Sequence, residues 1–229
     1  MIPLLERLDS YDRDMLLGNS KPLTVTKGDF IFREGEFADK LFFIKKGQIR
    51  VFKQMKKNKE ITVFIRQDLD SFGEIGIFSG NLYSNSAEAV TNCKLYYIER
   101  EHMETIMSQN GRLSLQVTKW LAESLEGSKA KLRDYLILGS EGAVASVFVR
   151  LSNMYGVITA EGIYISEPIM VQDIGKLVGI SRETVSRIIS KWKEQGVLDA
   201  DQKYFIIKKI DYFEKMLICE KCGVQNCVL

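Results

Sequence analysis

The sequence predicts an α+β protein with an antiparallel β-barrel or β-roll first, a long helix next and a helix-turn-helix unit last. Short strands rich in β-branched and aromatic residues recur from about residue 20 to residue 98. Residues 113–138 contain no proline and show the apolar spacing of one helix. A helix–glycine–helix pattern occupies residues 169–198. The expected domains are residues 1–110, 111–138 and 139–218, followed by a cysteine tail over residues 219–229.

Composition limits the classes of function. The chain has 229 residues, is 45% hydrophobic and carries a net charge of +2, so it can form two cores but has no global basic field. Any nucleic-acid site must therefore be a local patch. The first residues, MIPLLERLDSYDRD, contain acidic residues and no long apolar run, so we expect no signal peptide. With no apolar stretch long enough for a membrane helix, we expect a cytoplasmic protein with reduced thiols.

The first region is predicted to be a set of short strands separated by glycine turns. The strands are expected within FIFREG, KLFFIKKGQIRVF, KEITVFIRQ and CKLYYIER. The glycines are Gly28, Gly35, Gly47, Gly73, Gly76 and Gly80. The basic segment KQMKKNKE lies between two of these strands, and we interpret it as a solvated hairpin tip rather than a nucleic-acid patch.

The long helix carries one apolar stripe, formed by Val117, Leu121, Leu125, Leu132 and Leu136. A stripe of this length often pairs with its twin in a dimer. It can equally pack against the chain's own barrel. The spacing alone leaves both alternatives open.

The second helix of the helix–glycine–helix pattern has the properties of a DNA-recognition helix. Ser181 is expected to cap it, and Ile188, Ile189 and Trp192 can face inward. The expected base contacts are Arg182, Glu183, Ser186 and Arg187. Arginine can bind guanine through two hydrogen bonds, glutamate can accept one from cytosine N4, and serine can bond to either base. Lys176, Lys191 and Lys193 are candidates for phosphate contacts.

Two segments of the chain resemble one protein family. QDIGKLVGISRETVSRII is similar to the helix-turn-helix of the CRP/FNR family of bacterial transcription regulators, and KGDFIFREGEFADKLFFIKKGQIRVF resembles that family's cyclic-nucleotide-binding-type β-roll. The resemblance implies a β-roll, a long dimerisation helix and a winged helix-turn-helix. It also implies a homodimer that binds palindromic double-stranded DNA, contacts RNA polymerase and is not an enzyme. Both the TGTGA and the TTGAT type of half-site remain open, as does activation versus repression.

The same resemblance locates a nucleotide-binding cassette, which runs in the family from Gly-Glu to Arg-Ser-Ala. Gly73, Glu74 and Gly76 match its first part. Asn85 stands where the phosphate-binding arginine is expected, followed by Ser86 and Ala87. Because an arginine–phosphate contact is a strong charge-assisted one, we expect no tight binding of a cyclic nucleotide.

Three of the four cysteines, Cys219, Cys222 and Cys227, lie in the tail with the spacing C-x2-C-x4-C. This spacing suits a zinc site, an iron–sulfur cluster or a redox disulfide between Cys219 and Cys222. Zinc and iron–sulfur sites usually need a fourth ligand, and the only histidine, His102, lies in the other half of the chain. From the residues alone these alternatives remain open.

The tail resembles that of the oxygen-responsive Fnr proteins of bacilli, a branch of the same family. That resemblance implies a [4Fe-4S] cluster held by Cys219, Cys222, Cys227 and Asp134, and hence oxygen or redox control of anaerobic genes. Without the resemblance, Asp134 is better interpreted as an exposed residue paired with Lys131 or Arg133. The alternative function is a CRP-like regulator controlled by a small ligand in the β-roll, with a zinc or redox-thiol tail.

Overall fold

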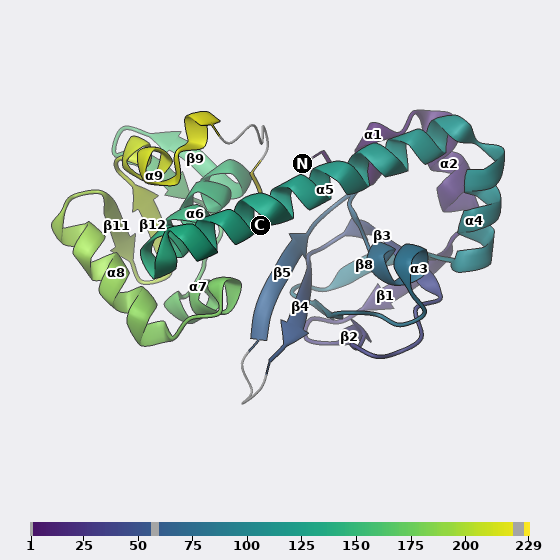
Figure 1. Cartoon of the computed structure of the whole chain (residues 1–229), viewed down its shortest axis with the longest axis horizontal. Helices are drawn as coiled ribbons and strands as arrows, with labels where there is room; N and C mark the ends of the chain where they lie inside the picture. The colour runs from purple at the N-terminus through teal and green to yellow at the C-terminus, as the bar shows by residue number, and fades with distance from the viewer. Residues whose placement is uncertain (1, 56–59, 222–226) are drawn as a thin grey trace. The chain divides into compact units, whose positions relative to one another are not determined.

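The structure, a computed structural model, describes residues 2–55, 60–221 and 227–229. The chain forms two compact units, residues 2–123 and 124–229, and the boundary falls inside the long helix α5, Gly111–Ile137 (Figure 1). No helix in the described ranges is long and apolar enough to cross a membrane.

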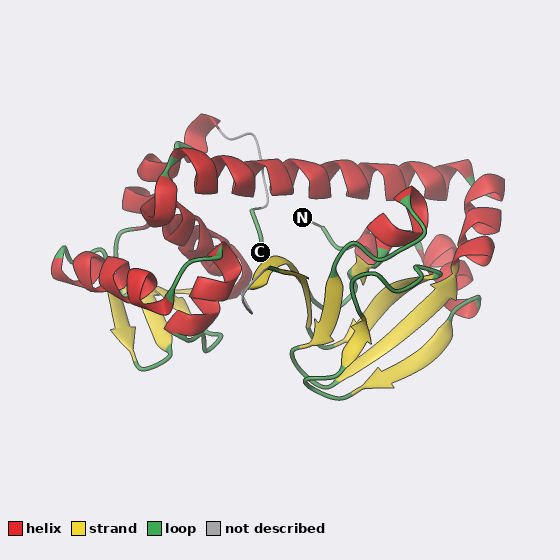
Figure 2. Ribbon diagram, turned by 60° about the horizontal axis from the view of Figure 1, so that its bottom comes forward, coloured by secondary structure: helices red, strands yellow, loops and turns green. Residues whose placement is uncertain are grey.

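The first unit is a β-roll of two four-stranded antiparallel sheets (Figure 2). One sheet has the order β1-β8-β3-β6, from Lys21–Val25, Cys93–Glu99, Lys40–Lys46 and Ser71–Phe72. The other has the order β2-β7-β4-β5, from Phe30–Phe32, Ser86–Ala89, Ile49–Gln54 and Glu60–Arg66. The unit also contains four short helices: α1 (Leu4–Arg7), α2 (Ser10–Gly18), α3 (Glu74–Ser79) and α4 (Arg100–Gln109).

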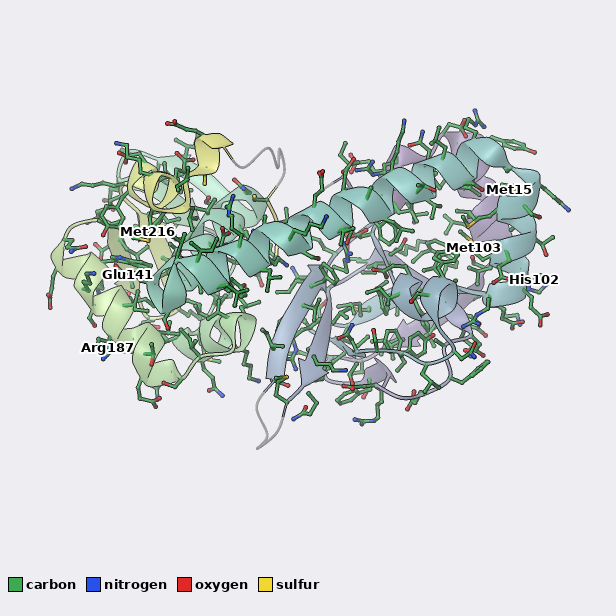
Figure 3. The ribbon with its side chains drawn as sticks, viewed as in Figure 1. Met15, His102, Met103, Glu141, Arg187 and Met216 are labelled. Atoms are coloured by element: carbon green, nitrogen blue, oxygen red, sulfur yellow. The ribbon has the colours of Figure 1, made fainter. Side chains whose placement is uncertain are left out.

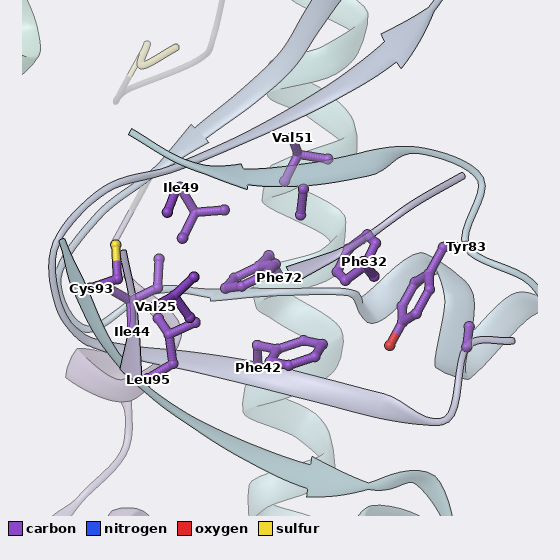
Figure 4. Packing of buried hydrophobic residues seen from close by; sticks show 13 residues of the cluster. Val25, Phe32, Phe42, Ile44, Ile49, Val51, Phe72, Tyr83, Cys93 and Leu95 are labelled. Carbon is purple, nitrogen blue, oxygen red and sulfur yellow. The ribbon is translucent and has the colours of Figure 1, made fainter. Parts of the chain in front are cut away.

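A cluster of aliphatic and aromatic side chains between the two sheets forms the core of the roll (Figure 4). The ring centroids of Phe32 and Tyr83 are 3.7 Å apart, and those of Phe42 and Phe72 are 5.0 Å apart. Stacked aromatic pairs add to the free energy gained by burying their apolar surface. The predicted β-roll is confirmed; Gly28, Gly35, Gly47 and Gly73 have positive φ angles, whereas Gly76 lies inside helix α3 rather than in a turn.

Gly47 divides KLFFIKKGQIRVF into two strands that belong to different sheets, because β3 pairs with β8 whereas β4 pairs with β5 and β7. Its φ is +114°, and a Cβ there would lie 2.5 Å from the Cys93 sulfur. Only glycine fits this position. The predicted hairpin tip falls mainly on residues 56–59, which lie outside the described part, although β4 and β5 pair up to Gln54 and Glu60.

Helix α5 has two different environments along its length. Leu113, Val117 and Trp120 near its start are buried in the first unit. Nearer its end, Leu125, Leu132 and Leu136 are exposed, the last by 74%. The first part of the stripe thus packs on the chain's own roll. The later leucines are exposed in this single chain, and their pairing with a second copy stays a prediction.

The second unit has the topology of a winged helix-turn-helix. Helices α6 (Gly139–Tyr155), α7 (Val171–Val178), α8 (Arg182–Glu194) and α9 (Ile210–Leu217) accompany a four-stranded sheet. Its order is β11-β12-β10-β9, from Leu198–Asp201, Tyr204–Ile207, Gly162–Ile165 and Gly156–Thr159. Phe148 packs in the core against Trp192, Phe205 and Phe213. A 3-10 turn, Cys219–Lys221, follows α9.

Candidate functional site

The turn between α7 and α8 fixes the start of the expected recognition helix. Gly179 has a φ of +72° and ends α7, a conformation that favours glycine. Gly175 lets the two helices approach closely, since a Cβ there would lie 2.8 Å from the Ile180 carbonyl oxygen. The Ser181 hydroxyl accepts a hydrogen bond from the Thr184 N–H at 3.2 Å, which confirms the predicted cap.

Helix α8 has one buried face and one exposed face. Val185, Ile188, Ile189 and Trp192 are buried. The four predicted base contacts, Arg182, Glu183, Ser186 and Arg187, are all exposed; Figure 3 labels Arg187. The structure therefore brings these four side chains to one accessible face of the helix, and their contacts to bases stay a prediction.

The first turn of α8 lowers the pKa of the Glu183 carboxyl on this face. The N–H of Glu183 itself and the Ser181 side chain lower the pKa of the Glu183 carboxyl, so this group remains an ionised acceptor at neutral pH. Lys191 pairs with Glu141 at 2.8 Å, and Glu141 also accepts a hydrogen bond from Trp192, while the phosphate contact of Lys191 stays a prediction. The Lys193 ammonium lies 3.1 Å from the Ala200 carbonyl oxygen. These two lysines thus hold α8 against its own unit.

The cassette in the roll is occupied by the chain's own side chains. Arg66 lies 3.7 Å from the Glu74 carboxylate and 3.0 Å from that of Asp70, and all three residues are buried. Trp120 of α5 donates a hydrogen bond to Asp70 at 3.2 Å. Burial raises the pKa of Glu74, with the positive charge of Arg66 opposing the shift.

The space next to this network is small. A cavity lined by Phe32, Phe72, Glu74, Tyr83 and Asn85, among others, has a volume of about 20 Å³. That is room for about one water molecule. The Asn85 amide donates to the Ser84 hydroxyl at 3.2 Å and supplies no positive charge. The expectation that the roll binds no cyclic nucleotide tightly stays a prediction.

Asp134 is buried rather than exposed, with 2% of its surface accessible. One carboxylate oxygen accepts a hydrogen bond from Arg133 at 2.6 Å. The other accepts from the Ser146 hydroxyl at 2.7 Å and lies 3.5 Å from an Arg150 nitrogen. The interpretation of Asp134 as a solvent-exposed residue is thus wrong, although its pairing with Arg133 is correct.

The segments on both sides of the cysteine tail lie close to Asp134 and its partners. Arg133 donates to the Leu217 carbonyl at 3.4 Å, just before Cys219. Arg150 donates to the Val228 carbonyl at 3.1 Å, just after Cys227. Asn153 donates to the Cys227 carbonyl at 2.8 Å. Two side chains that contact Asp134 therefore also bind the main chain that flanks the cysteines.

The cysteines themselves are only partly described. Cys219 and Cys227 are half-buried, and Cys222 lies outside the described residues. Among those that are described, no three His, Cys, Asp or Glu side chains are close enough to hold a metal ion. Cys93 is buried in the roll, where its thiol donates to the Thr91 carbonyl at 3.2 Å. His102 is exposed and lies 3.9 Å from Glu99.

Sequence reasoning missed Ser146, Arg150 and Asn153. One signal was present, since Arg150 is the only charged residue in the helical run AVASVFVRLSNMY. A charged side chain in the middle of an apolar stretch is seldom buried without a partner. It therefore indicates a buried carboxylate or another polar partner elsewhere in the chain.

Comparison with known proteins gives two family models that match separate parts of the chain. Residues 22–110 match the cyclic nucleotide-binding domain, and residues 142–216 match the Crp-like helix-turn-helix domain. The chain is 32% identical to the anaerobic regulatory protein of Bacillus subtilis (strain 168), over 93% of this chain and 91% of the relative. It is 25% identical to a CRP-like cAMP-activated global transcriptional regulator of Mycobacterium tuberculosis, over 82% of this chain and 84% of that protein.

Solved structures show the same fold. A CooA mutant from Carboxydothermus hydrogenoformans superposes with a TM-score of 0.78 at 20% identity, over 94% of this chain and 95% of that one. The regulator CLP of Xanthomonas campestris, described as c-di-GMP responsive, gives a TM-score of 0.77 at 20% identity, over 87% of this chain and 99% of CLP. The predicted arrangement of a β-roll, a long helix and a winged helix-turn-helix is confirmed by these neighbours.

Proposed function

Because this chain belongs to the CRP/FNR family of transcription regulators, we propose that it controls transcription in response to oxygen through a [4Fe-4S] cluster. The proposed ligands are Cys219, Cys222, Cys227 and Asp134. Regulators of this family bind DNA and act as dimers, and they are not enzymes. The proposed partners are a second copy of the chain, a palindromic DNA site and RNA polymerase in the cytoplasm.

The observation that carries the proposal is the position of Asp134 between the two flanks of the cysteine tail. The buried Asp134 carboxylate on α5 accepts a hydrogen bond from Arg133, which also donates to the Leu217 carbonyl before Cys219. Asp134 also contacts Arg150, which donates to the Val228 carbonyl after Cys227. The chain thus ties both ends of the cysteine segment to partners of one potential ligand, which supports a site assembled from α5 and the tail.

The charges of these residues suit an anionic occupant. Asp134 carries one negative charge, and the guanidinium groups of Arg133 and Arg150 near it carry two positive ones. Buried charge is costly unless it is balanced. Three thiolates and a carboxylate around an iron–sulfur core give a net negative site, which an excess of guanidinium charge would stabilise.

When bound, such a cluster would supply an oxygen-labile centre. Carboxylate is a harder ligand than thiolate and holds soft iron–sulfur centres less firmly. Asp134 therefore suits a cluster that must be released on exposure to oxygen. Because the proposed ligands lie on both α5 and the tail, the free energy of cluster binding would also contribute to the folding of residues 219–229.

The alternative, control by a small ligand in the roll, has support in the family model for cyclic nucleotide binding and in the cAMP-activated relatives. The described cassette argues against it. The Arg66 guanidinium pairs with the Glu74 carboxylate, and the remaining cavity has room for about one water molecule. Calorimetry that gave micromolar affinity for cyclic AMP, together with activation of DNA binding, would overturn the prediction that the roll binds no cyclic nucleotide tightly.

The first prediction tests the ligand set. Protein purified without oxygen should be brown, with broad absorption near 400 nm that air bleaches, and should contain iron and sulfide. Cys219→Ala, Cys222→Ala and Cys227→Ala should each abolish the cluster, because each removes a thiolate. Asp134→Ala should weaken it. Cys93→Ala is the matched control and should leave it intact. Full iron and sulfide content in any tail variant would reject the site.

A further inference from the structure

Arg150 is the most deeply buried cation near the proposed site. It lies on α6 in an otherwise uncharged run, and only 1% of its surface is accessible. Burying a guanidinium costs several kcal/mol unless its donors are satisfied. The contacts of Arg150 therefore show which groups compensate the burial of its charge.

Its three nitrogens have three different partners. Nε donates to the Ser146 hydroxyl at 3.1 Å, and that hydroxyl in turn donates to Asp134 at 2.7 Å. Nη2 lies 3.5 Å from the same Asp134 oxygen. Nη1 donates to the Val228 carbonyl at 3.1 Å. One rigid fork thus connects the carboxylate on α5, a hydroxyl on α6 and the main chain beside Cys227.

We propose that Arg150 is the positioning residue of the metal site: it orients the Asp134 carboxylate and holds the main chain after Cys227 beside it. This inference rests on the proposed function. Groups that hydrogen-bond to ligands without touching the metal fix ligand orientation and tune metal affinity. The planar fork suits this task because its donors have fixed directions, which a lysine ammonium cannot reproduce.

Arg133 provides an internal comparison. It binds the other oxygen of the same carboxylate through two nitrogens, at 2.6 and 3.0 Å, but a third of its side chain is accessible, so water can compete for these contacts. It also donates to the Leu217 carbonyl at 3.4 Å. The loss of Arg133 should therefore matter less than the loss of Arg150.

The experiment compares reconstitution with ferrous iron and sulfide under anaerobic conditions in wild type, Arg150→Gln, Arg150→Lys and Arg133→Gln. Transfer of iron to a chelator should be about 10- to 100-fold faster in Arg150→Gln. Arg150→Lys should be intermediate because it keeps the charge and loses the fork, and Arg133→Gln should stay nearer to wild type. The visible circular dichroism of the cluster should change in Arg150→Gln.

A structural control separates positioning from general destabilisation. Phe148→Leu alters the aromatic core on the same helix, where Phe148 packs against Trp192, Phe205 and Phe213 and is not among the described hydrogen-bond partners of Asp134. It should lower the thermal unfolding midpoint of the cluster-free protein and leave the cluster's circular dichroism and iron-transfer rate unchanged. If Phe148→Leu moves both as much as Arg150→Gln does, the positioning role is overturned.

The remaining outcomes distinguish this inference from the proposed function. A wild type that takes up no iron and sulfide rejects the proposed function and Arg150's role with it. A wild type that holds a cluster, with iron transfer unchanged in both Arg150→Gln and Arg150→Lys, rejects the role of Arg150 alone. Equal effects of Arg133→Gln and Arg150→Gln would also overturn the assignment.

Discussion

At the scale of single residues, Arg187 on α8 is predicted to recognise a base. It is exposed on the face that also carries Glu183 and Ser186. A bidentate contact to guanine would specify a central G·C pair in each half-site, with Glu183 accepting from the paired cytosine. Arg187→Ala should therefore cost about 1–3 kcal/mol of binding free energy and relax the preference at one base position.

The measurement is a binding selection from random DNA at fixed salt. Lys215→Ala is the matched control, because it removes the same charge from an exposed residue of α9 that pairs with Asp211. It should leave the selected sequence unchanged. If Arg187→Ala also selects the wild-type sequence, α8 does not recognise the bases and the assignment of all four contacts fails.

Single residues also show where sequence reasoning stopped. The spacing in α8 identified its exposed face, because helical periodicity alone decides which residues share a side. The burial of Asp134 depends on Ser146 and Arg150, which lie 12 and 16 residues further along the chain on another helix. No local pattern encodes that contact. The Arg66–Glu74 pair was missed for the same reason, since it forms only once the sheets have packed.

At the scale of elements, segments with strong local signals were predictable, and several short segments without such signals were not. The stripe of α5, the Gly179 turn and the Ser181 cap all carry strong local signals. Strand β9 is exposed along its whole length, and β11 buries only its first residue, so neither shows the alternation of buried and exposed residues that predicts a strand. Helices α1 and α3, of four and six residues, are too short to show a period.

The exposed leucines of α5 lead to a prediction about dimerisation. Leu125, Leu132 and Leu136 follow one another at seven and four residues, the spacing of a helix that packs against its twin. Burying a leucine contributes about 1.5–3 kcal/mol, and a symmetric dimer buries each one twice. Leu132→Glu should therefore cost about 3 kcal/mol or more and weaken dimerisation more than a hundredfold.

Sedimentation velocity across a concentration series measures the effect. Lys119→Glu is the control, because Lys119 is exposed on the same helix but lies roughly a third of a turn away from the stripe. It introduces the same acidic residue and should leave the dimer intact. An unchanged dissociation constant for Leu132→Glu would show that this stripe is not the dimer contact.

At the scale of the whole molecule, the proposed metal site and the recognition helix belong to the same compact unit, residues 124–229. Asp134 lies on the last part of α5, the helix whose exposed leucines are expected to join two copies. Binding of a cluster to Asp134 and the tail would therefore act on the element that sets the distance between two recognition helices. A palindromic site tolerates only one such distance, about one helical turn of DNA between half-sites.

Because DNA and cluster would favour the same arrangement of the dimer, each should strengthen the binding of the other. We expect the cluster-loaded protein to bind its palindrome about 5- to 150-fold more tightly than the cluster-free protein at equal salt, a coupling of roughly 1–3 kcal/mol. The same DNA should slow the transfer of iron to a chelator, and a scrambled duplex of equal length should not. Fluorescence anisotropy and iron-transfer assays on the same anaerobic samples measure both effects, with Cys93→Ala as a variant that should retain them. Equal DNA affinity with and without the cluster would mean that the metal site does not set the spacing of the recognition helices, even if the cluster is present in full.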